Sequence, residues 1–131
     1  MPVWRRAAIL TEIDEEDAEA VPYENDELAE ERSNRIATEI EKFVNTEAAY
    51  LDSHLVLEQV VERCNFSRRY VSNVLTERFG GFSDYVNGLR LNYFEQYKAQ
   101  HPNSTDESAA EASGFTSYKA YLKAKERLPQ K

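Results

Sequence analysis

The sequence predicts an all-α protein in which two helix-turn-helix units are joined by a long linker helix, behind an acidic and mostly disordered N-terminal leader. Three observations predict this fold. The chain of 131 residues has only four glycines and four prolines. Apolar residues recur at helical spacing from residue 33 onwards. A pattern of short helix, tight turn and capped second helix occurs twice.

Charge divides the chain into two unlike parts. Residues 1–53 contain five Lys and Arg against fifteen Asp and Glu, and residues 54–131 contain eleven against nine, which together give the net charge of −8. We predict that residues 1–32 form the leader, because residues 11–32 are acidic and poor in large apolar side chains. Such asymmetry is typical of a nucleic-acid surface with an acidic tail. The tail either competes with phosphate for the basic part or is only a solvated segment or linker remnant.

The folded domain is predicted over residues 33–131. It begins with an amphipathic helix over residues 33–50, whose apolar face carries Ile36, Ile40, Phe43 and Val44. The first unit covers about residues 55–80. Its short first helix ends in a turn at Asn65, and Ser67 is a good N-cap for the second helix because its hydroxyl can accept a free backbone N–H. The glycines at 80 and 81 end that helix.

The linker helix is predicted over about residues 82–100, where a wide apolar stripe indicates packing on two neighbours. The second unit covers about residues 104–128. Ser104 and Glu107 have the spacing of a capping box for its first helix. A turn at Gly114 follows, then a cap at Thr116 or Ser117, and the last helix runs to about residue 128.

Two stretches carry a resemblance to a known family. They are "LEQVVERCNFSRRYVSNVLTERFGGFSDYVNGLRLNYF" and "STDESAAEASGFTSYKAYLKAKERL". Over residues 51–128 the chain resembles the DNA-binding domain of AraC/XylS-type bacterial transcription regulators, and "YVNGLRL" is similar to Bacteroidetes members. Ala109 and Lys125 depart from the family, which usually has Ile and an aromatic residue there, and the family's closing Gly-x-Thr-Pro is missing. The resemblance implies a cytoplasmic regulator of transcription whose partner is double-stranded DNA, with RNA polymerase or another protein domain as a further partner.

In the first unit, the surface of the second helix suits base recognition. Arg69, Ser72 and Asn73 lie on one face at i, i+3 and i+4, and Arg68 lies beside it, closer to a phosphate. In the major groove, Arg pairs with guanine and Asn with adenine through two hydrogen bonds each. The resemblance places base-contacting side chains at the positions of Arg69, Ser72 and Asn73. A solvated helix start is a weaker interpretation of the arginine pair, since positive charge opposes the helix dipole there.

In the second unit, the matching positions are those of Lys119, Leu122 and Lys123, with Ser117 and Tyr118 alongside. Lysines attract phosphate with little directionality. We therefore expect the first unit to specify the sequence and the second to anchor the protein. With the linker helix fixing their separation, the two recognition helices are expected to enter successive major grooves about 34 Å apart.

Other classes of function find little support in the sequence. There is no glycine-rich phosphate loop and no nucleophile elbow, so no enzyme is predicted. His54 and His101 lie far apart and Cys64 is the only cysteine, so neither a metal nor a cofactor is predicted. No apolar run is long enough to span a membrane, and a single cysteine fits the cytoplasm. The alternative is a degenerate helix-turn-helix module used for protein–protein interaction, which the low net charge of residues 54–131 favours.

Overall fold

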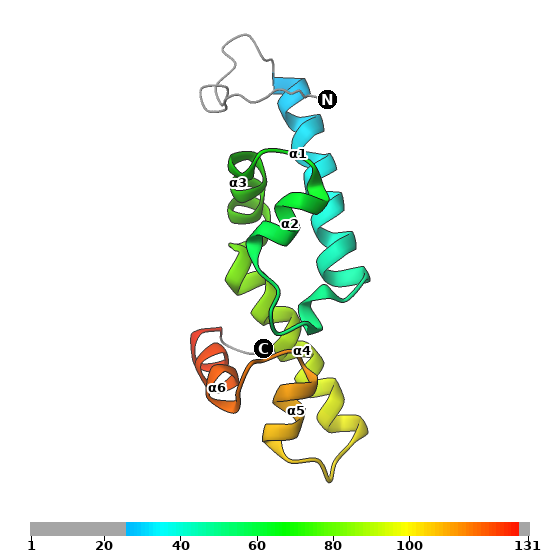
Figure 1. Ribbon diagram of the computed structural model, residues 1–131, viewed down its shortest axis with the longest axis vertical. Coiled ribbons are helices and arrows are strands. Elements are labelled where there is room, and N and C mark those ends of the chain that lie inside the picture. The colour runs from blue at the N-terminus through cyan, green and yellow to red at the C-terminus, as the bar shows by residue number, and fades with distance from the viewer. Residues whose placement is uncertain (1–25, 129–131) are drawn as a thin grey trace.

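The computed structural model of this chain describes residues 26–128, and every regular element within that range is a helix. The predicted all-α class is therefore confirmed. In chain order the elements are α1 (Asp26–Ile40), the π-helical turn η2 (Glu41–Thr46), the 3-10 turn η3 (Ala49–Leu51), α2 (Leu57–Cys64), α3 (Arg68–Phe79), α4 (Phe82–Gln100), α5 (Asp106–Ala112) and α6 (Tyr118–Arg127). The molecule is elongated: α2 and α3 lie beside α1 at one end, and α5 and α6 lie beside α4 at the other (Figure 1).

The first helix begins earlier than predicted. Residues 26–32, assigned to the leader, form the first two turns of α1, and residues 1–25 lie outside the described range. Contacts with α3 explain the difference. Arg78 Nη2 donates to Asn34 Oδ1 over 2.6 Å and lies 3.9 Å from a carboxylate oxygen of Glu30. These contacts fix the first turns of α1 against α3, although the composition of residues 26–32 alone does not favour a folded state.

The same helix also ends earlier than predicted. A single helix over residues 33–50 is wrong, because α1 passes into a π-helical turn at Glu41 and the chain then reverses at Ala48, whose φ of 62° is left-handed. The Glu47 carboxylate accepts two hydrogen bonds from Arg63 of α2, over 2.9 and 2.8 Å. The chain therefore turns back where this ion pair joins η2 to α2.

The helix pair α2–α3 follows the sequence prediction closely. The turn contains Asn65 in the left-handed region, and Ser67 caps α3 by accepting a hydrogen bond from the amide of Tyr70 over 3.4 Å. The helix ends at Gly80, whose φ of 78° suits glycine. The predicted cap and the predicted glycine stop are confirmed.

The second helix pair, α5–α6, differs from its prediction at one cap. Thr105 caps α5 by accepting from the amide of Ser108 over 3.0 Å, whereas the Ser104 hydroxyl donates to the carbonyl of His101 over 2.7 Å. The capping box predicted at Ser104 is therefore wrong by one residue. Ser117 is the cap of α6. The linker helix α4 has the predicted bounds, 82–100.

Two hydrophobic cores lie along the molecule. The first is formed by α1, η2, the loop before α2, α2, α3 and the start of α4. Its buried residues are Ile36, Ile40, Val44, Leu55, Val60, Cys64, Val71, Val74, Leu75 and Val86. The second is smaller and contains Leu91, Phe94, Ala109, Ala110, Phe115, Tyr121 and Ala124. Because α4 contributes to both, it fixes one helix pair relative to the other.

Arg90 of α4 adds a polar connection between the two cores. Its Nε donates to the carbonyl of Tyr50 over 2.6 Å, and its Nη2 donates to the carbonyl of Asp52 over 2.9 Å. Gly114, in the turn before α6, packs against the same place: a Cβ at Gly114 would collide with the Tyr50 carbonyl oxygen. The turn between α5 and α6 thus packs against the segment that precedes the α2–α3 pair.

Candidate nucleic-acid interface

The α2–α3 pair presents the predicted recognition residues on the outer side of α3. Val71, Val74 and Leu75 face the first core, so the opposite side of the helix is left to solvent. Arg69 and Asn73 are exposed there, and Ser72 is partly buried. The helix periodicity that predicted this face is thus reflected in the burial pattern, while the role of these side chains in base recognition stays a prediction.

Arg68 is engaged by a neighbouring helix. Its Nη1 donates to Oε2 of Glu58 on α2 over 2.6 Å. This hydrogen bond lowers the pKa of the Glu58 carboxyl, so the carboxylate is ionised at neutral pH. The predicted phosphate contact would require Arg68 to exchange this partner for the phosphate.

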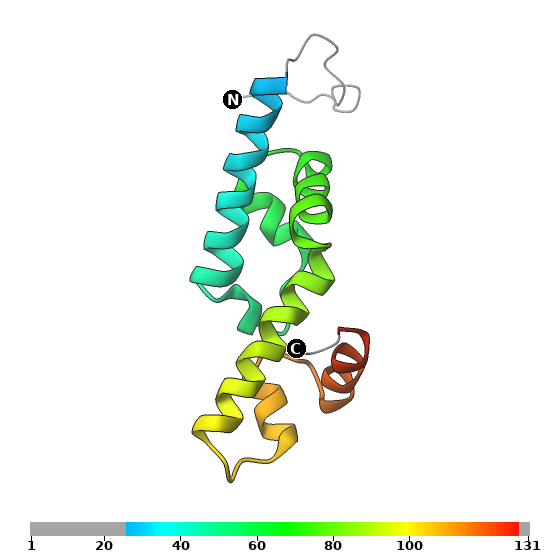
Figure 2. The same ribbon diagram turned by 180° about the vertical axis from the view of Figure 1, so that it is seen from behind.

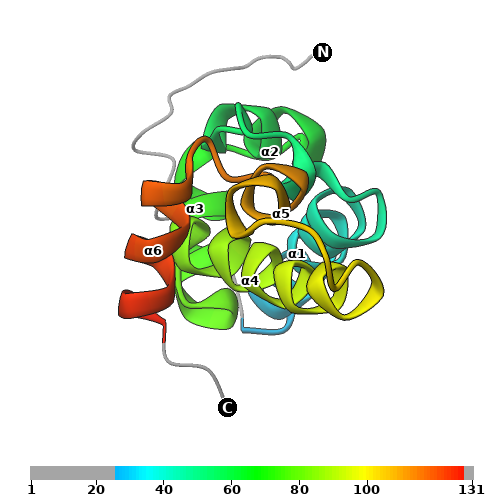
Figure 3. The same ribbon diagram turned by 90° about the horizontal axis from the view of Figure 1, so that it is seen from below.

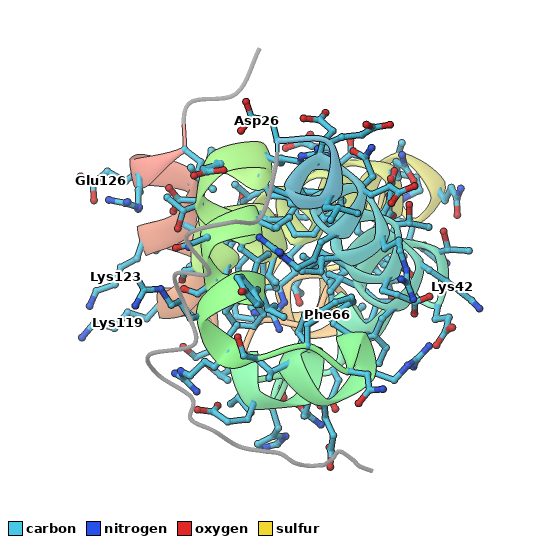
Figure 4. The ribbon with its side chains drawn as sticks, turned by 90° about the horizontal axis from the view of Figure 1, so that it is seen from above. Asp26, Lys42, Phe66, Lys119, Lys123 and Glu126 are labelled. Atoms are coloured by element: carbon cyan, nitrogen blue, oxygen red, sulfur yellow. The ribbon has the colours of Figure 1, made fainter. Side chains whose placement is uncertain are left out.

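The second helix pair presents a different set of side chains. Lys119 and Lys123 are exposed and point away from the body of the protein (Figure 4). The Ser117 hydroxyl is occupied as the N-cap, accepting from the amide of Ala120 over 3.1 Å. Tyr118 is half-buried, and its ring lies 5.8 Å from that of Tyr121 in the second core. Of the four predicted contacts on this helix, the two lysines are therefore those with the outward placement.

The two candidate recognition helices lie on the same side of the molecule. In Figure 1 and in the reverse view of Figure 2, α3 and α6 are both found to one side of the long axis that α1 and α4 follow. Viewed along that axis, α6 stands at the edge of the molecule, on the side of α3 (Figure 3). Side chains on both helices can therefore face one extended partner.

A polar groove, not predicted from the sequence, runs between α1 and α3. It has a volume of about 300 Å³ and is lined by Ala29, Arg32, Ser33, Ile36, Arg69, Tyr70, Asn73, Val74 and Glu77. Two of the predicted base-contacting residues, Arg69 and Asn73, thus form one of its walls. The groove was missed because Arg32 falls in the segment interpreted as leader. The one signal in the sequence that indicated this groove is the position of Arg32, directly before the predicted amphipathic helix.

A second cavity lies on the other flank of α1. Its volume is about 450 Å³, and it is lined by Asn34, Arg35, Thr38, Glu39, Arg63, Cys64, Asn65 and Phe66. Burial raises the pKa of the Cys64 thiol to about 11, so the thiol is protonated at neutral pH. The thiolate is the reactive form of cysteine, and this wall of the cavity therefore offers no nucleophile.

No group of three or more His, Cys, Asp and Glu side chains within residues 26–128 is placed to hold a metal ion. In the same range, no helix combines the length and the apolar character needed to cross a membrane.

Comparisons of the chain with protein-family models, with curated proteins and with solved structures find no match. The resemblance to AraC/XylS-type regulators therefore rests on the motif residues quoted above.

Proposed function

We propose that this protein is a sequence-specific regulator of transcription of the AraC type, which binds double-stranded DNA and reads the major groove mainly through α3. One observation carries the proposal: α3 and α6 lie on the same side of the molecule (Figure 1), and Lys119 and Lys123 of α6 point away from its body (Figure 4). A duplex is a partner long enough to meet both helices at once.

The chemistry of the two faces supports different roles. On α3, Arg69 can donate two hydrogen bonds to guanine, and the Asn73 amide can both donate to and accept from adenine. On α6, Lys119 and Lys123 are point charges that suit phosphate. Base contacts specify a sequence, whereas phosphate contacts position the protein. The first helix pair is thus the reader and the second the anchor.

Selection of bound sequences from random duplexes tests the assignment of roles. We expect Arg69→Ala and Asn73→Ala each to cost about 1–3 kcal/mol and to relax the preference at particular base positions. Lys123→Ala is the matched control, and it should weaken binding to all sequences alike. If the α3 variants also weaken binding uniformly, these side chains contact only phosphate and the reading role is wrong.

The salt dependence of binding tests the proposal as a whole. Contacts with phosphate release counterions, so the DNA affinity of the wild-type chain should fall steeply as the salt concentration rises. DNA binding that is absent at low salt would remove the proposal.

A protein-interaction module is the second candidate, and one residue favours it. Leu122 is 44% exposed on α6, at helical positions between Lys119 and Lys123. An apolar side chain between two lysines suits RNA polymerase or another protein domain as partner. Under this alternative, Leu122→Ser abolishes the binding of that partner. Under the DNA proposal, the same change should lower DNA affinity less than the loss of Lys119 or Lys123 does, because the lysines carry the phosphate contacts of α6.

A further inference from the structure

The groove between α1 and α3 is held open by fixed contacts. Its base is apolar and consists of the buried side chains of Ile36 and Val74. Arg32 rises from α1, and its guanidinium carbon lies 3.9 Å from the centroid of the Tyr70 ring on α3. The hydrogen bond between Arg78 and Asn34 joins the same two helices. The side chain of Arg32 is therefore held over α3 by stacking.

The opposite wall of the groove belongs to the candidate recognition face. Arg69 and Asn73 come from α3, so cationic side chains from two helices line one polar groove. Stacking uses the flat face of a guanidinium, whereas hydrogen bonds to a phosphate use its edge. Arg32 can thus keep its contact with Tyr70 while it binds an anion.

The position of the groove follows the course of a DNA backbone. A helix in the major groove has a phosphate backbone along each of its flanks, because the groove is about 12 Å wide and a helix with its side chains nearly fills it. One flank of α3 adjoins α2, where Arg68 is paired with Glu58. The other flank adjoins α1 and carries Arg32.

We infer that this groove is a phosphate-binding site for the DNA backbone, and that Arg32 of α1 is a phosphate contact additional to those of the two helix pairs. The inference rests on the proposed function and deepens it, since it makes α1 part of the interface. Carboxylates lie nearby as well. Glu77 lines the groove, and Glu30, which lies two residues before Arg32 in α1, is 3.9 Å from Arg78. The phosphate is therefore placed beside Arg32, Arg69 and Asn73, away from Glu77.

The test is the salt dependence of DNA affinity, measured by fluorescence anisotropy with a labelled duplex of random sequence and the full chain. We expect Arg32→Gln to reduce the slope of log affinity against log salt by about 0.9, the value for one lost phosphate contact. Extrapolated from 1 M to 0.1 M salt, that slope corresponds to an affinity lower by about eightfold. Arg32→Lys keeps the charge and should keep the slope.

Arg35→Gln is the matched control. It removes the same charge from the same helix, but Arg35 lines the other cavity and lies 5.7 Å from the Phe66 ring. A wild-type slope for Arg32→Gln would overturn the inference. Equal reductions of the slope in Arg32→Gln and Arg35→Gln would also overturn it, because they would indicate only a general effect of charge. Circular dichroism establishes that each variant is folded, so that slopes are compared only between folded proteins. If the wild-type chain itself does not bind DNA, the proposed function fails, a result distinct from binding that is insensitive to Arg32.

Discussion

Replacement of Gly114, a buried residue in the turn before α6, by alanine should destabilise the protein strongly. Gly114 has a φ of 99°, which residues with a Cβ rarely adopt. Its Cβ would collide with the carbonyl oxygen of Tyr50 and lie 3.0 Å from both Nε of Arg90 and the Cα of Leu51. Two of these three obstacles are backbone atoms, which cannot move aside as a side chain can.

The magnitude follows from two costs. Forcing a residue with a Cβ into a disfavoured backbone conformation costs about 1–3 kcal/mol. Moving the Tyr50 carbonyl away also breaks its 2.6 Å hydrogen bond with Arg90, and a hydrogen bond to a charged group contributes about 1.5–3 kcal/mol. The variant Gly114→Ala should therefore lose roughly 2.5–6 kcal/mol of unfolding free energy, a large part of the 5–15 kcal/mol typical of a native protein.

The chain offers a control of opposite sign. Gly88 lies inside α4, and a Cβ there would meet no atom within 4 Å. Since alanine is the better helix former, Gly88→Ala should stabilise the protein by about 0.8–1 kcal/mol. Urea unfolding followed by circular dichroism measures both variants. A loss below about 1 kcal/mol for Gly114→Ala would show that the turn relaxes freely and would refute the reasoning.

Three further predictions concern single polar groups. The Tyr85 hydroxyl is buried without a hydrogen-bond partner among the described residues, and burial raises its pKa to about 12. Tyr85→Phe should therefore raise the free energy of unfolding, measured in urea, by about 1 kcal/mol. A loss of stability would show that the hydroxyl has a partner. The hydrogen bond from Arg63 lowers the pKa of Glu47 below its usual 4.5. The stability that this carboxylate contributes is therefore present above pH 4.5 and is lost as the pH falls through the lower pKa of the folded state. The difference in unfolding free energy between the wild type and Glu47→Gln should shrink as the pH falls below 4.5. A difference that stays constant with pH would contradict the lowered pKa of Glu47. Glu58→Gln removes the carboxylate that pairs with Arg68. Because Arg68 can then contact a phosphate, anisotropy titrations should show a higher DNA affinity and a salt dependence steeper by about one phosphate contact. An unchanged slope would show that Arg68 does not contact phosphate.

Local signals predicted the middle of the chain well. The bounds of α4, the cap at Ser67 and the glycine stop at Gly80 all depend on neighbours within a few residues, and the structure confirms them. The amphipathic face of α3 is equally local, because burial at i, i+3 and i+4 follows from helix geometry. A single sequence is sufficient for features of this kind.

Features that depend on residues distant in the sequence were not predicted. The start of α1 at Asp26 is supported by Arg78, which is more than forty residues away. The reversal at Ala48 coincides with the ion pair between Glu47 and Arg63. In both places composition and periodicity gave the wrong boundary, because tertiary contacts outweigh the weak preferences of a short segment.

The candidate site divides in the same way. That Arg69 and Asn73 face outward could be predicted from the period of α3. The pairing of Arg68 with Glu58 and the packing of Tyr118 on Tyr121 could not, because each requires knowledge of which helix lies alongside. The groove beside Arg32 was also beyond prediction, since it exists only where α1 meets α3.

The unequal cores have a consequence for the motions of the native protein. Three of the seven buried residues in the second core are alanines, which bury little area, whereas the first core is built largely from valine, isoleucine and leucine. Proteins open in cooperative units whose opening free energies follow such packing. The amides of α5 and α6 should therefore exchange with deuterium before those of α2 and α3. A ligand that binds only the closed state raises the opening free energy of every unit whose opening abolishes binding, so the amides of α5 and α6 should exchange more slowly when the protein is saturated with its ligand.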